Sequence, residues 1–190
     1  MLSICKKELH QFFSSLTGYM AIVLFLLVNG LFLFVLKDSN LLDFGYATLD
    51  RFCELAPWVL VFLVPAITMR SLSEEIKSGT IEVLRTKPLS CRHIVLGKYL
   101  AILVVLIFAI LPTLLYVFTI GQLSAGGSID SGGITGSYLG LFMLAAVFAA
   151  ISLCSSGFSA NPVVAFLVSA FVCILLYFGF HALSKLTLFR

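Results

Sequence analysis

EEIKSGTIEVLRTKP, residues 74–88, is a charged island between two apolar runs at 52–69 and 100–121. Each run approaches the length of about 20 residues that an apolar helix needs to cross a bilayer. Half of the chain's 12 Lys and Arg residues lie between Arg70 and Lys98, although the sequence is 61% hydrophobic and only 11% charged. The island is therefore where a water-soluble partner would contact a membrane-embedded protein.

The rest of the chain is apolar enough to cross a membrane several times. Its mean hydropathy is +1.12 over 190 residues. Because a backbone inside hydrocarbon must satisfy its own hydrogen bonds, apolar runs of membrane length form helices. The sequence predicts an all-α polytopic bundle, built as one domain over the whole chain. The five predicted spans are 19–36, 52–69, 100–121, 137–153 and 163–180.

The cations predict the orientation of these spans. They gather before the first span and in the segment 70–98, whereas the connections at 37–51 and 122–136 hold few or none. Because cytoplasmic connections are rich in Lys and Arg, we expect the N-terminus and the 70–98 segment on the cytoplasmic side of an inner (plasma) membrane. Five spans would leave Lys185 and Arg190 outside, which suggests a sixth span beyond the end of this sequence.

Residues 1–17 have the pattern of an amphipathic helix and not that of a cleavable signal peptide. The apolar and polar positions that alternate there are Leu2, Ile4, Leu9, Phe12, Phe13 and Leu16 against Lys6, Lys7, Glu8, His10 and Gln11. We expect this helix to lie in the cytoplasmic membrane interface, with its lysines among the lipid headgroups. The alternative is a frayed basic flank.

The first half of the island contains a helix start and a helix stop. Ser71 followed by Glu74 fits a capping box, which predicts a short helix that begins as the chain leaves the second span. Gly79 is expected to break that helix.

The second half of the island predicts another short helix, which crosses between the spans. Thr80 can cap a helix over 81–86, and Pro88 ends it because the residue before a proline disfavours helical geometry. Ser90 can then cap a last helix that enters the third span. The alternative is a solvated loop with ordinary interface charges.

The motif EExKxGTIExLxxxPLS at 74–90, followed by VLGKYLA at 95–101, resembles the signature of ABC-2 type transporter permeases. It is most similar to the branch that includes the gliding-motility-associated ABC transporter permease subunit. The resemblance covers essentially the whole chain. Members of the family typically have six spans, which agrees with a sixth span beyond Arg190.

By that resemblance, residues 71–98 form a cytoplasmic coupling loop, and its residues 73–86 sit in a cleft of a separate ATP-binding subunit. The loop would convert motion of that subunit into tilting of the second and third spans, and its acidic residues would pair with cations of the partner. The residues that match the motif are Glu74, Glu75, Gly79, Thr80, Glu82, Pro88, Gly97 and Lys98.

The resemblance also implies that ATP and Mg²⁺ bind to the partner subunit, that this chain binds no cofactor, and that it is not an enzyme. The pair Gly97-Lys98 lacks the upstream Gly and the following Ser or Thr of a Walker A loop, which agrees with this expectation. Two permease halves, identical or related, would enclose the path. Together they would carry out substrate export or a process related to gliding motility.

A carboxylate and three prolines stand out within the spans. Glu54 is a candidate for lining a translocation path, because an intramembrane carboxylate is costly unless it meets water or a partner. Its position near the outer end of the second span also allows plain interfacial solvation, which we favour. Pro57, Pro65 and Pro112 are candidates for kinks in the second and third spans. The five cysteines are scattered and lack the spacing of metal ligands.

Small residues gather at the entry to the fourth span. Gly132, Gly136 and Gly140 are spaced four residues apart, and alanines continue the pattern between 145 and 150. Such a face lets helices approach closely. We expect it to pack within the chain, with a subunit interface as the alternative.

A second functional class uses the same charged loop. A membrane anchor or assembly factor would recruit a cytoplasmic protein through the 71–98 segment without transporting anything. An ATPase partner whose turnover depends on this chain would distinguish a permease from such an anchor.

Overall fold

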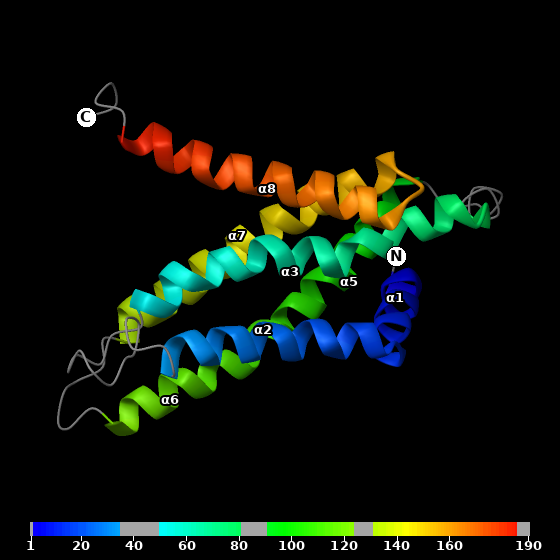
Figure 1. The fold of residues 1–190 in the computed structure, drawn as a ribbon. Coiled ribbons are helices and arrows are strands. Elements are labelled where there is room, and N and C mark those ends of the chain that lie inside the picture. The colour runs from blue at the N-terminus through cyan, green and yellow to red at the C-terminus, as the bar shows by residue number, and fades with distance from the viewer. Residues whose placement is uncertain (1, 35–49, 81–90, 124–130, 186–190) are drawn as a thin grey trace.

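The structure of the protein, a computed structural model, describes residues 2–34, 50–80, 91–123 and 131–185. Within these ranges the regular structure is helical and contains no strand, as Figure 1 shows. The elements are α1 (Leu2–Ser14), α2 (Leu16–Phe34), α3 (Asp50–Lys77), α5 (Cys91–Ile110), the 3₁₀ turn η1 (Leu111–Thr113), α6 (Leu114–Leu123), α7 (Ser131–Phe158) and α8 (Pro162–Lys185).

The described helices are long and apolar enough to form a membrane bundle. Four stretches qualify as spans by themselves: α3, α5 continued through η1 into α6, α7, and α8. The pair α1 and α2, which is bent by 70°, gives a fifth when it is counted as one span. This confirms the predicted all-α polytopic architecture.

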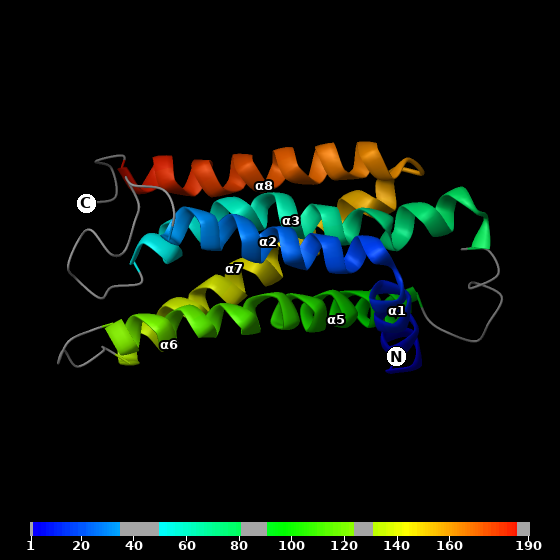
Figure 2. The same ribbon diagram turned by 60° about the horizontal axis from the view of Figure 1, so that its bottom comes forward.

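The two ends of the bundle differ in which elements they bring together. At one end, on the right in Figure 1, α1 lies next to the last turns of α3 and the first turns of α5. We call this the α1 end. The last turns of α2 and α6 and the first turns of α3 and α7 lie at the opposite end. Figure 2 shows α1 crossing the bundle at a steep angle to α2.

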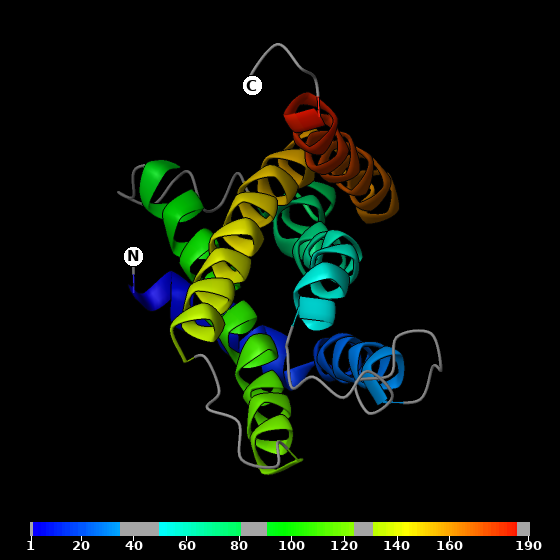
Figure 3. The same ribbon diagram turned by 90° about the vertical axis from the view of Figure 1, so that its left-hand side faces the viewer.

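Helix α3 is the centre of the bundle. It contacts α2, α5, α7 and α8, and Figure 3, which looks along the bundle, shows it between α2, α7 and α8. Its inward face carries Phe52, Leu60 and Val64, which are fully buried against residues such as Phe148 of α7. Packing of large apolar side chains at four interfaces therefore holds α3 in place.

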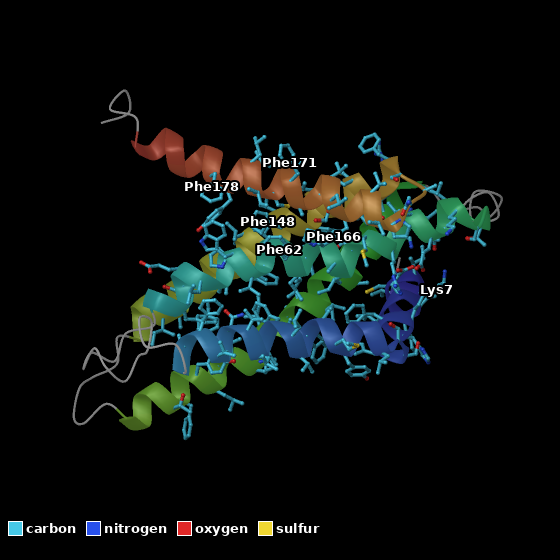
Figure 4. All side chains as sticks on the ribbon, viewed as in Figure 1. Lys7, Phe62, Phe148, Phe166, Phe171 and Phe178 are labelled. Carbon is cyan, nitrogen blue, oxygen red and sulfur yellow. The ribbon has the colours of Figure 1, made fainter. Side chains whose placement is uncertain are left out.

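The outer faces of the helices are apolar as well. On α8, Leu167 and Phe171 are exposed, and Figure 4 shows Phe171 on that helix while Phe148 lies inside the bundle. Large apolar side chains are exposed on the other long helices as well. Such an apolar surface is abnormal for a protein in water but expected for one in lipid.

Three local predictions can be compared with the helix boundaries. The capping box at Ser71 was wrong, because α3 continues without interruption through that position to Lys77. The backbone N–H groups there are already inside a helix, so they need no cap. Gly79 does end the helix: it adopts a φ of +69°, the left-handed conformation that glycine tolerates best. Pro112 lies in η1, where the third span tightens into a 3₁₀ turn.

The prediction for the small residues of α7 was wrong in part. A Cβ atom added to Gly136 or Gly140 would meet no atom within 4 Å among the described residues. These two glycines therefore do not provide close packing within the described chain. Farther along α7, Ala145 and Ala149 are fully buried in the core, so the alanines do pack internally. The two groups lie on different faces of one helix.

Candidate functional site at the α1 end

The α1 end is organised around one buried lysine. Lys98 on α5 has an exposed side-chain fraction of only 1%. Its Nζ lies 2.7 Å from Oε1 of Glu8 on α1 and 3.0 Å from Oε1 of Glu75 on α3, and it donates a hydrogen bond of 2.7 Å to the carbonyl oxygen of Ser71. An ammonium group has three N–H donors, so these three acceptors satisfy it completely. One side chain thus ties α1, α3 and α5 together.

Helical spacing explains why these three side chains meet. On α5, Lys98 shares a face with Ile94, Ala101 and Ile102, all of them buried. Glu8 lies three residues after Cys5, the buried residue of α1, so both point to the same side of that helix. The apolar neighbours bring the helices into contact, and the charged groups then lie where water is excluded.

A charge cluster of this kind is costly to break. Removing water from a charge costs several kcal/mol, and the mutual attraction offsets this only while both signs are present. A second cation, Lys7, lies 3.5 Å from Oε1 of Glu75, with 57% of its side chain exposed. Figure 4 labels Lys7 on α1, beside the last turns of α3. The other carboxylate oxygen of Glu75 is buried without a hydrogen-bond partner. The cluster therefore favours one relative placement of the three helices.

The next residue on α3 has a different environment. Glu74 forms an ion pair of 3.5 Å with Arg70 one turn earlier, and both side chains are about half exposed. An exposed pair of this kind contributes little, about 0.3–0.5 kcal/mol. The exposed residues continue through Ser78, whose hydroxyl donates to the carbonyl oxygen of Glu74 at 2.7 Å, to Thr80. This surface is open to a partner.

The sharp turn from α1 to α2 depends on a glycine. A Cβ atom at Gly18 would lie 2.5 Å from the backbone oxygen of Phe12 and 3.0 Å from its ring. Because backbone cannot move aside as a side-chain tip can, no larger residue fits there without opening the bend. Gly18 therefore permits the angle that brings Glu8 to Lys98.

A serine of α7 forms hydrogen bonds to the backbone of α3 just before the charged cluster. The hydroxyl of Ser156 accepts hydrogen bonds from the backbone N–H groups of Leu72 and Ser73, at 3.1 and 3.2 Å, and donates to the carbonyl oxygen of Met69 at 3.0 Å. A side chain inserted into a helix's own hydrogen-bond ladder is a recognised cause of local distortion. The last turns of α3 are thus attached to α7 by a polar contact.

The structure separates the predicted coupling residues into two groups. Glu75 and Lys98 point inward and bind each other, and Gly97 is buried beside Lys98. Glu74, Gly79 and Thr80 lie on the accessible surface. The remaining predictions lie outside the described residues: Glu82, Pro88, the helix over 81–86 and the cap at Ser90.

Sequence reasoning missed some of the residues that build this junction. Glu8 was placed with the polar face of an interfacial helix, yet it is the one carboxylate before position 38, a signal that it has a cationic partner. Gly18 and Ser156 gave no such signal, because each acts through the backbone of a distant segment. Glu54, at the other end of α3, lies on an exposed face with Trp58, away from the junction.

Comparison with known proteins agrees with the motif. The family model described as ABC-2 family transporter protein matches residues 2–187. No curated protein and no solved structure matches the sequence. The family match includes every helix that meets at the α1 end. The chain therefore belongs to the ABC-2 transporter family and is a membrane permease component of an ABC transporter, which implies an ATP-binding partner.

Proposed function

We propose that the α1 end is the coupling site at which a separate ATP-binding subunit moves the spans of this permease. The observation that carries the proposal is the buried Lys98, which ties α1 and α5 to the last turns of α3. Any displacement of these turns must be passed to α1 and α5, or else the ion pairs of Glu75 with Lys98 and Lys7 must break. The cluster is therefore a means of transmitting force between helices.

The partner would bind the exposed side of the same helix. Glu74, Gly79 and Thr80 form an accessible surface that continues directly from the buried core of α3. Because α3 is one continuous helix, a push on its last turn acts on the whole span. Glu75 and Lys98, which bind each other, would hold the helices together, while Glu74 would meet cations of the partner.

The proposal includes the orientation and the assembly. The N-terminus and the α1 end would face the cytoplasm of an inner membrane, where the partner binds ATP and Mg²⁺, and α1 would lie in the membrane interface. Two permease halves, identical or related, would form the path. Export of a substrate, or a process related to gliding motility, would be driven by ATP hydrolysis, and Glu54 remains a candidate for lining the path.

The decisive experiment measures ATP turnover of the native partner subunit in proteoliposomes with this chain. Gly79→Pro removes the left-handed conformation observed at that position, and Glu74→Lys reverses an exposed charge. We expect both variants to insert normally and to lose binding of the partner or stimulation of its ATPase. Ser128→Lys, in the connection that the charge pattern puts on the opposite side, should leave both unchanged.

Two results would count against the proposal. If Gly79→Pro and Glu74→Lys stimulate the partner as the unmodified chain does, the α1 end is not the coupling site. If the partner binds but its turnover is the same with and without this chain, the chain is a membrane anchor instead of a working permease.

A further inference from the structure

A groove of about 1150 Å³ opens between the bent pair α1–α2 and helices α3 and α5. Pockets for small ligands commonly measure about 300–1,000 Å³, so this groove has room for a larger molecule. Along α3 it runs from Lys77 to Ala66, an axial distance of roughly 16 Å at 1.5 Å per residue.

The two halves of the groove differ in chemistry. Near the α1 end it is lined by charged side chains, including the cations Lys7, Arg70 and Lys77. Farther along it is lined by apolar side chains, including Met20, Leu24 and Ile67. Met20 and Leu24 are 62% and 63% exposed, so this part of the wall is uncovered within the described chain. A groove with a charged end and an apolar channel is complementary to an amphiphilic molecule that has a charged head and an apolar tail.

The ion pairs leave positive charge for the head. Of the acidic residues that line the groove, Glu8 and Glu75 are bound to buried Lys98, and Glu74 pairs with Arg70 at 3.5 Å. Lys7, whose side chain is 57% exposed, balances the second carboxylate through its 3.5 Å contact with Glu75, and Lys77 lies exposed at the end of α3 without an acidic partner among the described residues. The lining therefore carries one net positive charge, that of Lys77, and the largely exposed Lys7 on the other side of the groove can turn from its long contact with Glu75 toward an anion at the mouth.

We propose that this groove binds an anionic phospholipid of the bilayer, with its phosphate between Lys7 and Lys77 and an acyl chain along Met20, Leu24 and Ile67. Basic pockets between membrane helices recognise phospholipid headgroups in this way. The site lies beside the ion pairs that join α1 to α3, so a bound lipid would stabilise the bend between α1 and α2. The proposal concerns binding alone and stands whether or not the chain couples to an ATPase.

The test is native mass spectrometry of the full chain released from detergent micelles that contain phosphatidylglycerol. The double variant Lys7→Gln with Lys77→Gln should retain roughly tenfold less lipid, because each basic residue near a headgroup adds to its attraction. The matched control is Lys6→Gln with Arg92→Gln, which removes the same charge from exposed positions at the same end that do not line the groove.

A second pair of variants tests the apolar half. Ala66→Phe adds a ring to the groove wall and should lower lipid retention, whereas Ala150→Phe on the exposed face of α7 should not. Thermal unfolding of each variant shows whether it is folded. A diacylglycerol with the same acyl chains, which lacks the phosphate, should be retained weakly by every variant.

Three results would overturn the assignment. Equal loss of lipid in the two charge variants would mean general attraction to a basic surface. Equal retention of phosphatidylglycerol and diacylglycerol would mean that the headgroup is not recognised. Unchanged retention in both the Lys7/Lys77 and the Ala66 variants would mean that the groove is filled by something else, such as a helix of a partner protein.

Discussion

The two halves of α3 are held in different ways. From Phe52 to Val64 the helix is packed by apolar side chains of α2, α7 and α8. From Met69 to Lys77 it is held by polar contacts: the hydroxyl of Ser156 on its backbone and the ion pair from Glu75 to Lys98. Apolar packing is non-directional and resists displacement in proportion to the area buried. A few directional polar bonds can instead be exchanged as a unit, which is consistent with the movement proposed for this end of α3.

Removing the buried cation should have the largest effect. Lys98→Ala leaves Glu8 without its partner and Glu75 with only its longer contact to Lys7, and breaking a largely buried ion pair typically costs about 3–5 kcal/mol. We expect α1 to detach from α5 while the spans remain folded. Maleimide labelling of Cys5, which is buried on α1, measures this in a variant without the other cysteines. Arg92→Ala, at an exposed position of the same helix outside the groove, is the control. Slow labelling of Cys5 in Lys98→Ala would show that the cluster does not hold α1.

A cavity in the apolar half of α3 should lower the folding stability of the bundle without exposing Cys5. Leu60→Ala removes a fully buried side chain from the centre of α3, at a cost of about 2–5 kcal/mol of folding stability. Thermal unfolding in detergent should show the loss. Labelling of Cys5 below the unfolding temperature should stay slow. Rapid labelling in this variant would mean that the two halves of α3 do not behave separately.

The bend between α1 and α2 should respond to a single added methyl group. Gly18→Ala places a Cβ atom within 2.5 Å of the carbonyl oxygen of Phe12, and overpacking of this kind costs about 1–3 kcal/mol. We expect faster labelling of Cys5 than in the unmodified chain, but slower than in Lys98→Ala. Gly136→Ala is a suitable control, because its added methyl group meets open space. Identical labelling in the two alanine variants would contradict the steric argument.

The hydrogen bonds from Ser156 of α7 to the backbone of α3 should make the smallest contribution to stability. Ser156→Ala removes the hydroxyl between Met69 and Ser73, for a loss of about 1 kcal/mol. Hydrogen exchange of the Leu72 and Ser73 amides should become faster. Ser169→Ala removes a buried hydroxyl that donates to the carbonyl oxygen of Phe166 within α8, and should leave these amides protected. Equal exchange in both variants would assign no role to Ser156.

In the 71–98 segment, the sequence predicted features that depend on the local backbone but not those that depend on tertiary contacts. Gly79 was expected to end a helix, and it does, because its conformation depends on its own backbone. The capping box at Ser71 was wrong because a tertiary contact from Ser156 and the continuing span override a local signal. For Gly136 and Gly140 the spacing led us to expect close packing within the chain, but their face lies open within the described chain.

The amino-acid sequence by itself determined the class of the protein: long apolar runs must become helices in lipid, and the motif after the second span indicated the transporter family. Only the tertiary structure decided the roles of individual charges. Lys77 and Lys98 are the same residue type in the same charged segment, yet one is exposed and the other is buried between two carboxylates. Composition and periodicity are properties of neighbouring residues along the chain, so they can be read from the sequence. The environment of a charge depends instead on which distant helices come within a few ångströms of it.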